Sequence, residues 1–584
     1  MQSSLRHSLL WMTLLAATTP GLSDCDLQPL VATRQGLVRG GVGRSDAGRI
    51  FHSFKGLPYA RAPVGRLRFQ PPQRHPGWEG AADATRHGSR CLQFDYFQNF
   101  TEDGSEDCLF ANVYTPRLPG PHGGGGGGGL PVMVFIHGGG FTVWDGDEQW
   151  FGPRYFMDED VVLVTFNYRL GPFGFFTTHD RHAPGNYGLL DQVMLLRWVR
   201  DNIAFFGGDP EAVTIFGESA GGTSVSLMVI SPLARGLFHH AISQSGSAIS
   251  TFGVSGRQQG SATKFATQLN CSTEDVAAMV ECVREVSAHD LNNAVKELGV
   301  AKVHFYPRVD READSPLLPE SPRLLLERGD FNLVPWIQGQ TEEEGTLLMF
   351  ESLSDPAVMA RLFAGNLTQW GLFADLTTAS TSRILDCGAD PAEEVRKVFD
   401  FYAGNATLSY DNLLPLARVA GDREVLVPMT EELLLASQHA PVYQYVLDHR
   451  GAGRLSFPEA VSLLSPDLGP THGDDLLYLF ANERQAPPPA GHAAHTMIRF
   501  VVSLWSSFAR TGRPHSSVLA MPDWPLFTER SRRYMRINSE PSLGEHLGTE
   551  RVRFWQTVRV NEPWRHPVQA SCTEEAAAAP EGEM

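Results

Sequence analysis

The stretch FGGDPEAVTIFGESAGG, from Phe206 to Gly222, predicts a buried strand that turns sharply into a helix. Residues 212–216 are apolar and rich in β-branched and aromatic types, which is typical of a strand. The pattern G-x-S-x-G follows at 217–221, and its glycines let the strand and the helix approach each other closely. We interpret Ser219 as a candidate nucleophile at the helix start, where free N–H groups stabilise negative charge.

This pattern alone is also compatible with an ordinary glycine turn, because the chain contains 57 glycines. A second element supports a chemical role. The strand-like stretch 132–136 ends abruptly in His-Gly-Gly-Gly-Phe at 137–141. In such a loop, backbone amides reach a tetrahedral oxyanion without side chains in the way. We expect an oxyanion loop here, completed by the N–H of Ala220, and a flexible turn is the alternative.

A serine hydroxyl needs a general base, and the base needs an acid that orients it. Among 20 histidines, His472 is the best placed, because it lies in the glycine-punctuated loop GPTHGDD at 469–475. For the acid, a triple glutamate at 342–344 follows the apolar stretch 333–337, and Glu344 directly precedes a glycine. A triple glutamate is also typical of a solvated face, and the residue pattern does not choose among its members.

With these motifs the chain resembles the type-B carboxylesterase and cholinesterase family of α/β-hydrolases, from about residue 35 to about residue 563. Its pattern is closest to that of invertebrate-type secreted carboxylesterases. Further matching motifs are FHSFKGLPYA at 51–60, RF at 68–69, SEDCLF at 105–110, NYRLG at 167–171, GNYGLLDQ at 185–192 and QSGS at 244–247. The resemblance implies the α/β-hydrolase fold, an α/β class with a large central, mostly parallel sheet and helices on both faces.

The resemblance also implies roles for individual residues, in the order serine, acid, histidine along the chain. It assigns Ser219 as nucleophile, Glu344 as acid and His472 as base. It assigns Gly139, Gly140 and Ala220 as oxyanion donors. It implies a buried polar network behind the triad made of Glu218, Ser245 and Asp475. Asp475 stands where cholinesterases carry glutamate, so its shorter side chain puts that part of the network in question.

The function implied is a serine carboxylesterase that hydrolyses small-molecule carboxylic esters through an acyl-enzyme, without metal or organic cofactor. The interval between Cys91 and Cys108 contains no tryptophan that could stack on a quaternary ammonium, so we do not expect choline-ester specialisation. Two alternatives remain open. Juvenile-hormone-type esterases share several motifs but usually carry glutamine where this chain has Glu218. Neuroligin-like adhesion proteins keep the fold without a triad.

Length and composition agree with one large enzyme domain. With 584 residues and 42% hydrophobic content, the chain can bury a substantial core, and the spread of motifs predicts a single domain over 24–565. A basic start followed by an apolar run predicts a signal peptide at 1–23, hence a secreted protein, and no other segment favours stable membrane insertion. We expect a disordered acidic tail at 566–584. A net charge of −18 disfavours nucleic-acid partners.

Cysteine usage fits an oxidising compartment. The resemblance implies two disulfides, Cys91–Cys108 and Cys271–Cys282, and the loss of a third family bridge whose positions fall near Val427 and Val552. Of the cysteines left over, which are Cys25, Cys387 and Cys572, the last is a candidate for a disulfide-linked dimer. Four sequons predict glycosylation at Asn99, Asn270, Asn366 and Asn405.

The rest of the chain predicts alternating strands and helices. Apolar runs predict sheet strands at Val132–Ile136, Val161–Phe166, Val213–Phe216 and Leu333–Ile337. Helical spacing of apolar residues predicts a helix over Gly188–Phe205. We interpret the seven glycines at 123–129 as a solvated hairpin tip.

Overall fold

The computed structural model describes residues 28–95, 101–119, 128–254, 258, 260–298, 304–349, 386, 389–406, 408, 412–451, 454–457, 467–483, 488–489 and 491–566. The expected signal peptide at 1–23 and the expected tail, except His566, lie outside these residues. So do three cysteines and two sequon asparagines: Cys25, Cys387, Cys572, Asn99 and Asn366.

An eleven-stranded mixed sheet forms the centre of the molecule, with the order β16-β15-β14-β13-β12-β11-β9-β10-β8-β4-β3. Every pairing from β10 across to β15 is parallel, and the pairings outside them are antiparallel. The strands are β3 (Gly41–Arg44), β4 (Ile50–Pro58), β8 (Phe110–Thr115), β9 (Leu130–Ile136), β10 (Val162–Phe166), β11 (Gly208–Glu218), β12 (His240–Gln244), β13 (Trp336–Thr341), β14 (Val442–Leu447), β15 (Arg533–Ile537) and β16 (Ser542–Glu545). The expected fold class is therefore confirmed.

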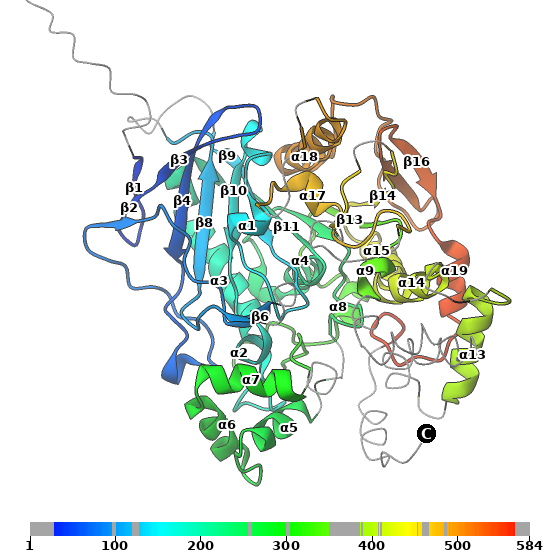
Figure 1. The fold of residues 1–584 in the computed structure, drawn as a ribbon, viewed down its shortest axis with the longest axis horizontal. Coiled ribbons are helices and arrows are strands. Elements are labelled where there is room, and N and C mark those ends of the chain that lie inside the picture. The colour runs from blue at the N-terminus through cyan, green and yellow to red at the C-terminus, as the bar shows by residue number, and fades with distance from the viewer. Residues whose placement is uncertain are drawn as a thin grey trace, which may run out of the picture.

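Two small sheets and a set of helices surround the central sheet, as Figure 1 shows. The small sheets are β1 (Leu30–Ala32), β2 (Leu37–Arg39) and β5 (Ala81–Asp83), and β6 (Gln93–Asp95) with β7 (Thr101–Asp103). The longer helices are α3 (Tyr187–Asn202), α4 (Ala220–Ile230), α5 (Ser261–Gln268), α6 (Val276–Glu285), α7 (Ala288–Leu298), α13 (Pro391–Tyr402), α14 (Leu414–Gly421), α15 (Val427–Ala436) and α18 (Ala494–Thr511). The shorter ones are α1 (Glu148–Phe151), α2 (Gly171–Phe175), α8 (Pro322–Glu327), α9 (Gly345–Leu348), α17 (Leu476–Leu479) and α19 (Thr549–Trp555).

Strand β9 is apolar along its whole length because both faces of the sheet are covered. Side chains alternate between the two faces of a strand. In β9, Val132, Val134 and Ile136 join the hydrophobic cluster that contains α3 and α4. Met133 and Phe135 join the second cluster, which contains α18. Continuous apolar runs are thus the signature of this two-sided burial.

Three details of the sequence interpretation are wrong. The strand expected at Leu333–Ile337 begins only at Trp336 and continues to Thr341, and Leu333 is 57% exposed. The strands on either side of the glycine run, β8 and β9, form no hairpin, because they lie on opposite sides of β10 and do not pair. The expected helix ends as α3 at Asn202 and continues as a separate 3-10 turn over Ile203–Phe206. For the strand and the helix, the hydrophobic pattern locates the element, but the hydrogen bonds of the ladder or helix set its ends.

The cysteine and glycan expectations can be compared with the described residues. Disulfides join Cys91 to Cys108 and Cys271 to Cys282. Val427 and Val552, the positions of the lost bridge, are both buried on helices α15 and α19, which contact each other. The sequon asparagines Asn270 and Asn405 are exposed. No helix within the described ranges is long and apolar enough to span a membrane.

A buried ion pair locks the loop after β10 onto helix α3. The guanidinium of Arg169 donates to both carboxylate oxygens of Asp191 at 2.8 Å, and the Arg169 N–H donates to the same carboxylate at 3.1 Å. Their side chains are 3% and 0% exposed. Burial raises the pKa of Asp191, whereas Arg169 opposes that rise and favours the ionised form.

We predict that Asp191→Ala lowers the free energy of unfolding by about 3–5 kcal/mol, because it leaves a buried guanidinium without its counter-charge. Urea unfolding followed by tryptophan fluorescence measures this change. The double variant Arg169→Met/Asp191→Leu is the control and should recover much of the loss. A single variant as stable as the wild type would contradict the prediction.

Candidate active site

Ser219 occupies the sharp turn between β11 and α4 that the sequence predicts. Its φ of 60° and ψ of −125° are strained values for a residue with a Cβ. Close packing around the turn holds it there. A Cβ on Gly221 would lie 2.0 Å from the Ile136 carbonyl oxygen, and one on Gly217 would lie 2.5 Å from the same atom. Only glycine allows β9, β11 and α4 to come this close.

The glycine loop after β9 lies directly against this turn. A Cβ on Gly138 would be 3.1 Å from the Cβ of Ser219. Gly139 has φ +89° and approaches the carbonyl of Val143 so closely that a Cβ would lie 2.3 Å from it. Within the described residues, the amides of Gly139 and Gly140 donate no backbone hydrogen bond. The first N–H of α4, that of Ala220, also lacks a partner in its helix. Ala220 directly follows Ser219, and Gly139 and Gly140 directly follow the glycine that packs against Ser219.

His137, which begins the glycine loop, packs against Tyr168 and is neutral. Its ring stacks on Tyr168 with centroids 4.4 Å apart, and the Tyr168 hydroxyl donates to the His137 carbonyl at 2.9 Å. Burial lowers the pKa of His137 to about 4. A neutral imidazole adds no positive charge near the amides that follow it.

The structure brings His472 and Glu344 together. The Nδ1 of His472 donates to Glu344 Oε2 at 2.6 Å. The other oxygen, Oε1, accepts from the Ser245 hydroxyl and from the Thr341 N–H, each at 2.6 Å. All three donors approach a buried carboxylate whose position they fix. The imidazole is thereby held by Nδ1, and its Nε2 is not bonded to Glu344.

The three consecutive glutamates separate clearly in space. Glu342 pairs with Arg450 at 2.8 Å, and Glu343 pairs with Arg418 at 2.8 Å. Both arginines are at least 42% exposed, whereas the glutamate side chains are 33% exposed for Glu342 and 4% for Glu343. Glu344 alone of the three is bonded to His472.

Ser219 and His472 are near neighbours but form no hydrogen bond. Among the described residues, the Ser219 hydroxyl makes none at all, and the imidazole Nε2 lies 3.2 Å from Glu218 Oε1. Glu218 immediately precedes Ser219, so Nε2 faces the turn that carries the hydroxyl. Catalytic hydrogen bonds are often long without substrate and tighten when substrate binds.

No described hydrogen bond joins Glu218, Ser245 and Asp475, the residues expected to form one polar network, to one another. Ser245 bonds to Glu344, whereas Asp475 accepts from the Gln244 amide at 2.8 Å and from the Tyr445 hydroxyl at 2.9 Å. The Glu218 carboxyl has no hydrogen-bond partner among the described residues. The three residues thus contact different neighbours, and no described hydrogen bond joins Asp475 to Glu218.

Burial controls the charge of this region. It raises the pKa of Glu218 to about 8, assisted by the carboxylates of Asp475 and Glu344 and opposed by His472. It also raises the pKa of Asp475. Burial lowers the pKa of His472, but Glu218 and Glu344 more than offset this effect and raise it to about 9. One imidazole therefore shares a buried space with three carboxyl groups.

Sequence reasoning missed the residues that shape the His472 loop. Asp474 accepts from the N–H of Thr471 at 3.0 Å and from the N–H of Phe457 at 2.7 Å, so it closes the turn that presents His472. Gln244 and Tyr445, which bond Asp475, were also not identified. The available signal for Asp474 was its position two residues after the candidate base in a glycine-rich loop, where aspartate side chains bond nearby N–H groups.

Comparisons with known proteins agree with this geometry. The model of the carboxylesterase family matches residues 27–555. The juvenile hormone esterase of Tribolium castaneum is 36% identical over 83% of this chain and 84% of its own length. The liver carboxylesterase of Sus scrofa is 32% identical over 95% and 97%. A crystal structure of juvenile hormone esterase from Manduca sexta, with OTFP covalently attached, has a TM-score of 0.76 and 28% identity, covering 91% and 99%. The chain belongs to the carboxylesterase family and is a carboxylic ester hydrolase.

Proposed function

We propose that this carboxylesterase is a serine hydrolase that acts through an acyl-enzyme on Ser219. The observation that carries the proposal is the bond between His472 Nδ1 and Glu344, which leaves Nε2 facing the turn of Ser219. An imidazole with one nitrogen bound to a carboxylate and the other free is the general base of such enzymes.

In the first step, His472 Nε2 takes the proton of the Ser219 hydroxyl as the serine oxygen attacks the ester carbonyl. Negative charge then develops on the carbonyl oxygen. The amides of Gly139, Gly140 and Ala220, for which the described residues show no backbone acceptor, stabilise this charge. The imidazolium formed is stabilised by Glu344 and returns the proton to the leaving alcohol.

In the second step, water replaces the alcohol. His472 removes a proton from the water as it attacks the acyl carbonyl, and the same amides stabilise the second oxyanion. The carboxylic acid leaves and Ser219 regains its proton. Every group required comes from this chain, the ester and water.

The proposal also concerns the class of ester that the enzyme hydrolyses. The similarity to two juvenile hormone esterases makes a terpenoid methyl ester a candidate substrate, alongside aryl and fatty-acyl esters. Choline esters are not expected. A non-catalytic adhesion role is the competing function, and turnover of a short-chain aryl ester would exclude it.

We also propose that the protein is secreted. The apolar N-terminal run resembles a signal peptide, and the two disulfides suit an oxidising compartment.

We predict that Ser219→Ala lowers kcat by roughly 10⁵-fold or more, because the nucleophile is lost. The variant should also lose covalent labelling by an organophosphate, measured by intact-mass spectrometry. An unchanged circular dichroism spectrum is the control for folding. Undiminished hydrolysis in this variant would refute the assignment of Ser219.

We predict that Glu344→Gln lowers kcat by roughly 10⁴-fold, because an amide neither orients nor stabilises the imidazolium in the same way. Glu343→Gln and Glu342→Gln are matched controls, since their carboxylates pair with arginines toward the surface. Steady-state kinetics of the three variants measures the contrast. Equal losses in all three would contradict the role given to Glu344.

We predict that Glu218→Gln shifts the acid limb of the kcat/KM profile to lower pH. The carboxylate 3.2 Å from Nε2 raises the pKa of His472, so a neutral amide lets the imidazole lose its proton at lower pH. Hydrolysis rates across the pH range measure the shift, with Glu342→Gln as the control. A limb that stays in place or moves to higher pH would be the opposite result.

A further inference from the structure

The backbone that follows β9 takes a path that residues with side chains rarely adopt. Gly139, Gly140, Phe141 and Trp144 have φ values of 89°, 60°, 61° and 81°. For Phe141 and Trp144, this left-handed conformation costs free energy, because the Cβ crowds the backbone. Such a segment keeps its shape only where its surroundings hold it.

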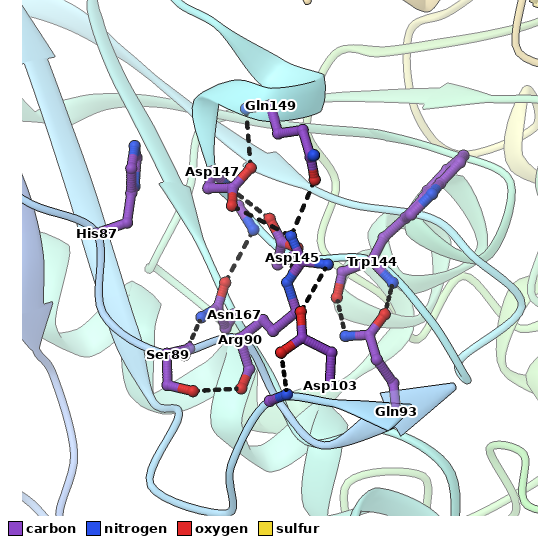
Figure 2. Close-up of polar contacts among 12 residues, drawn as sticks. His87, Ser89, Arg90, Gln93, Asp103, Trp144, Asp145, Asp147, Gln149 and Asn167 are labelled. Carbon is purple, nitrogen blue, oxygen red and sulfur yellow. Dashed lines mark hydrogen bonds and ion pairs between the residues drawn. The ribbon is translucent and has the colours of Figure 1, made fainter. Parts of the chain in front are cut away.

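The side-chain amide of Gln93 holds Trp144 from both sides, as Figure 2 shows. Gln93 Oε1 accepts from the Trp144 N–H at 2.7 Å, and Gln93 Nε2 donates to the Trp144 carbonyl at 3.0 Å. Nε2 donates also to the carbonyl of Cys91 at 2.9 Å. Gln93 is 2% exposed, so water does not compete for these bonds. Both Nε2 hydrogens are in use, and the amide can occupy only this orientation.

This clamp is one residue away from the peptide groups of the oxyanion loop. The N–H groups of Thr142 and Val143 donate to the Gly139 carbonyl at 2.9 and 3.1 Å. Because a trans peptide is planar, the Gly140 N–H points opposite to the Gly139 carbonyl. Fixing Val143 and Trp144 therefore fixes the direction of the Gly140 N–H.

The other end of the segment is fastened to the same disulfide-bridged loop. Arg90 contacts Asp145 at 3.1 Å and Asp147 at 3.5 Å. Asn167 accepts from the Gly146 N–H at 2.8 Å and donates to the carbonyl of Cys108 at 3.2 Å. Figure 2 shows Gln93, Arg90 and Asn167 around residues 144–147. Cys91 and Cys108, whose carbonyls anchor two of these side chains, are joined by the disulfide.

We propose that Gln93 is a positioning residue for ester hydrolysis: through Trp144 it aims the amide of Gly140 at the developing oxyanion. The inference rests on the proposed function. The described hydrogen bonds of Gln93 go to Trp144 and Cys91 and not to Ser219, so we expect its effect in the transition state rather than in substrate binding.

The test replaces Gln93 and separates binding from catalysis. Removal of one oxyanion donor typically lowers kcat by about 10²–10³-fold, so for Gln93→Ala, which misaligns donors, we expect a fall of about 10- to 100-fold. KM should stay within about two-fold, because the ester ground state does not depend on aligned amides. Affinity for an alkyl trifluoromethyl ketone, whose adduct with serine carries the oxyanion, should fall in parallel with kcat.

Two further variants separate positioning from general destabilisation. Asn202→Ala removes a comparable buried amide, which accepts from the Arg34 N–H and donates to the Trp198 carbonyl, each at 3.0 Å. We expect it to lower Tm yet leave kcat within about two-fold of the wild type. Gln93→Glu keeps the size of the side chain and the acceptor for the Trp144 N–H but loses both donors. If Gln93→Ala fails to fold, Gln93→Glu takes its place in the test, and we expect the same loss of kcat at unchanged KM.

Two results would overturn the proposal. One is wild-type kcat and ketone affinity in the Gln93 variants, and the other is an equal loss of kcat in Asn202→Ala. If the wild type itself shows no turnover that depends on Ser219, the proposed function fails and the inference fails with it. Turnover that depends on Ser219 but not on Gln93 removes the inference alone.

Discussion

The approach of two glycines to one carbonyl is the constraint on which the rest of this site depends. Gly217 and Gly221 both pack against the carbonyl of Ile136, the last residue of β9, at distances that exclude any Cβ. This contact joins the end of β9 to the turn between β11 and α4. It places the amides after β9 beside Ser219 with no freedom to separate. Catalysis by backbone amides needs this rigidity, because a misdirected N–H stabilises no charge.

Buried charge is the second constraint, and it acts through His472. Three carboxyl groups surround one imidazole in a region that excludes water. Ionising all three would be costly, and burial raises the pKa of Glu218 and of Asp475. Three hydrogen-bond donors hold the carboxyl group of Glu344 in place. Burial alone would lower the pKa of His472, but the carboxyl groups that face the imidazole raise it.

The sequence was sufficient for the fold class and for the motifs that converge, because those features depend on local patterns. Glycine spacing around Ser219 and after Ile136 indicates close backbone contacts, and apolar runs indicate a sheet buried on both faces. Choosing Glu344 among three glutamates required the family resemblance, since which carboxylate meets His472 depends on the path of a loop far along the chain. Asp474 and Gln93 were not identified, because each acts on backbone groups; only Asp474 has a local signal, its place in the glycine-rich loop after His472. The strand at Trp336 was placed too early, since Leu333 is apolar but exposed.

Of the ten non-glycine residues with positive φ in the described part of the chain, Ser219, Phe141 and Trp144 lie in the turn and the loop that form the candidate site. Strain of this kind must be opposed by contacts from outside the segment. At Ser219 the opposing contacts are the packed ends of strands, which belong to the core and would hold in any variant that folds. At Trp144 they are a few side-chain hydrogen bonds from the loop closed by Cys91 and Cys108. The two halves of the site thus differ in how they are secured. The nucleophile is fixed by the fold itself, whereas the oxyanion loop depends on side chains that can be changed without altering the core.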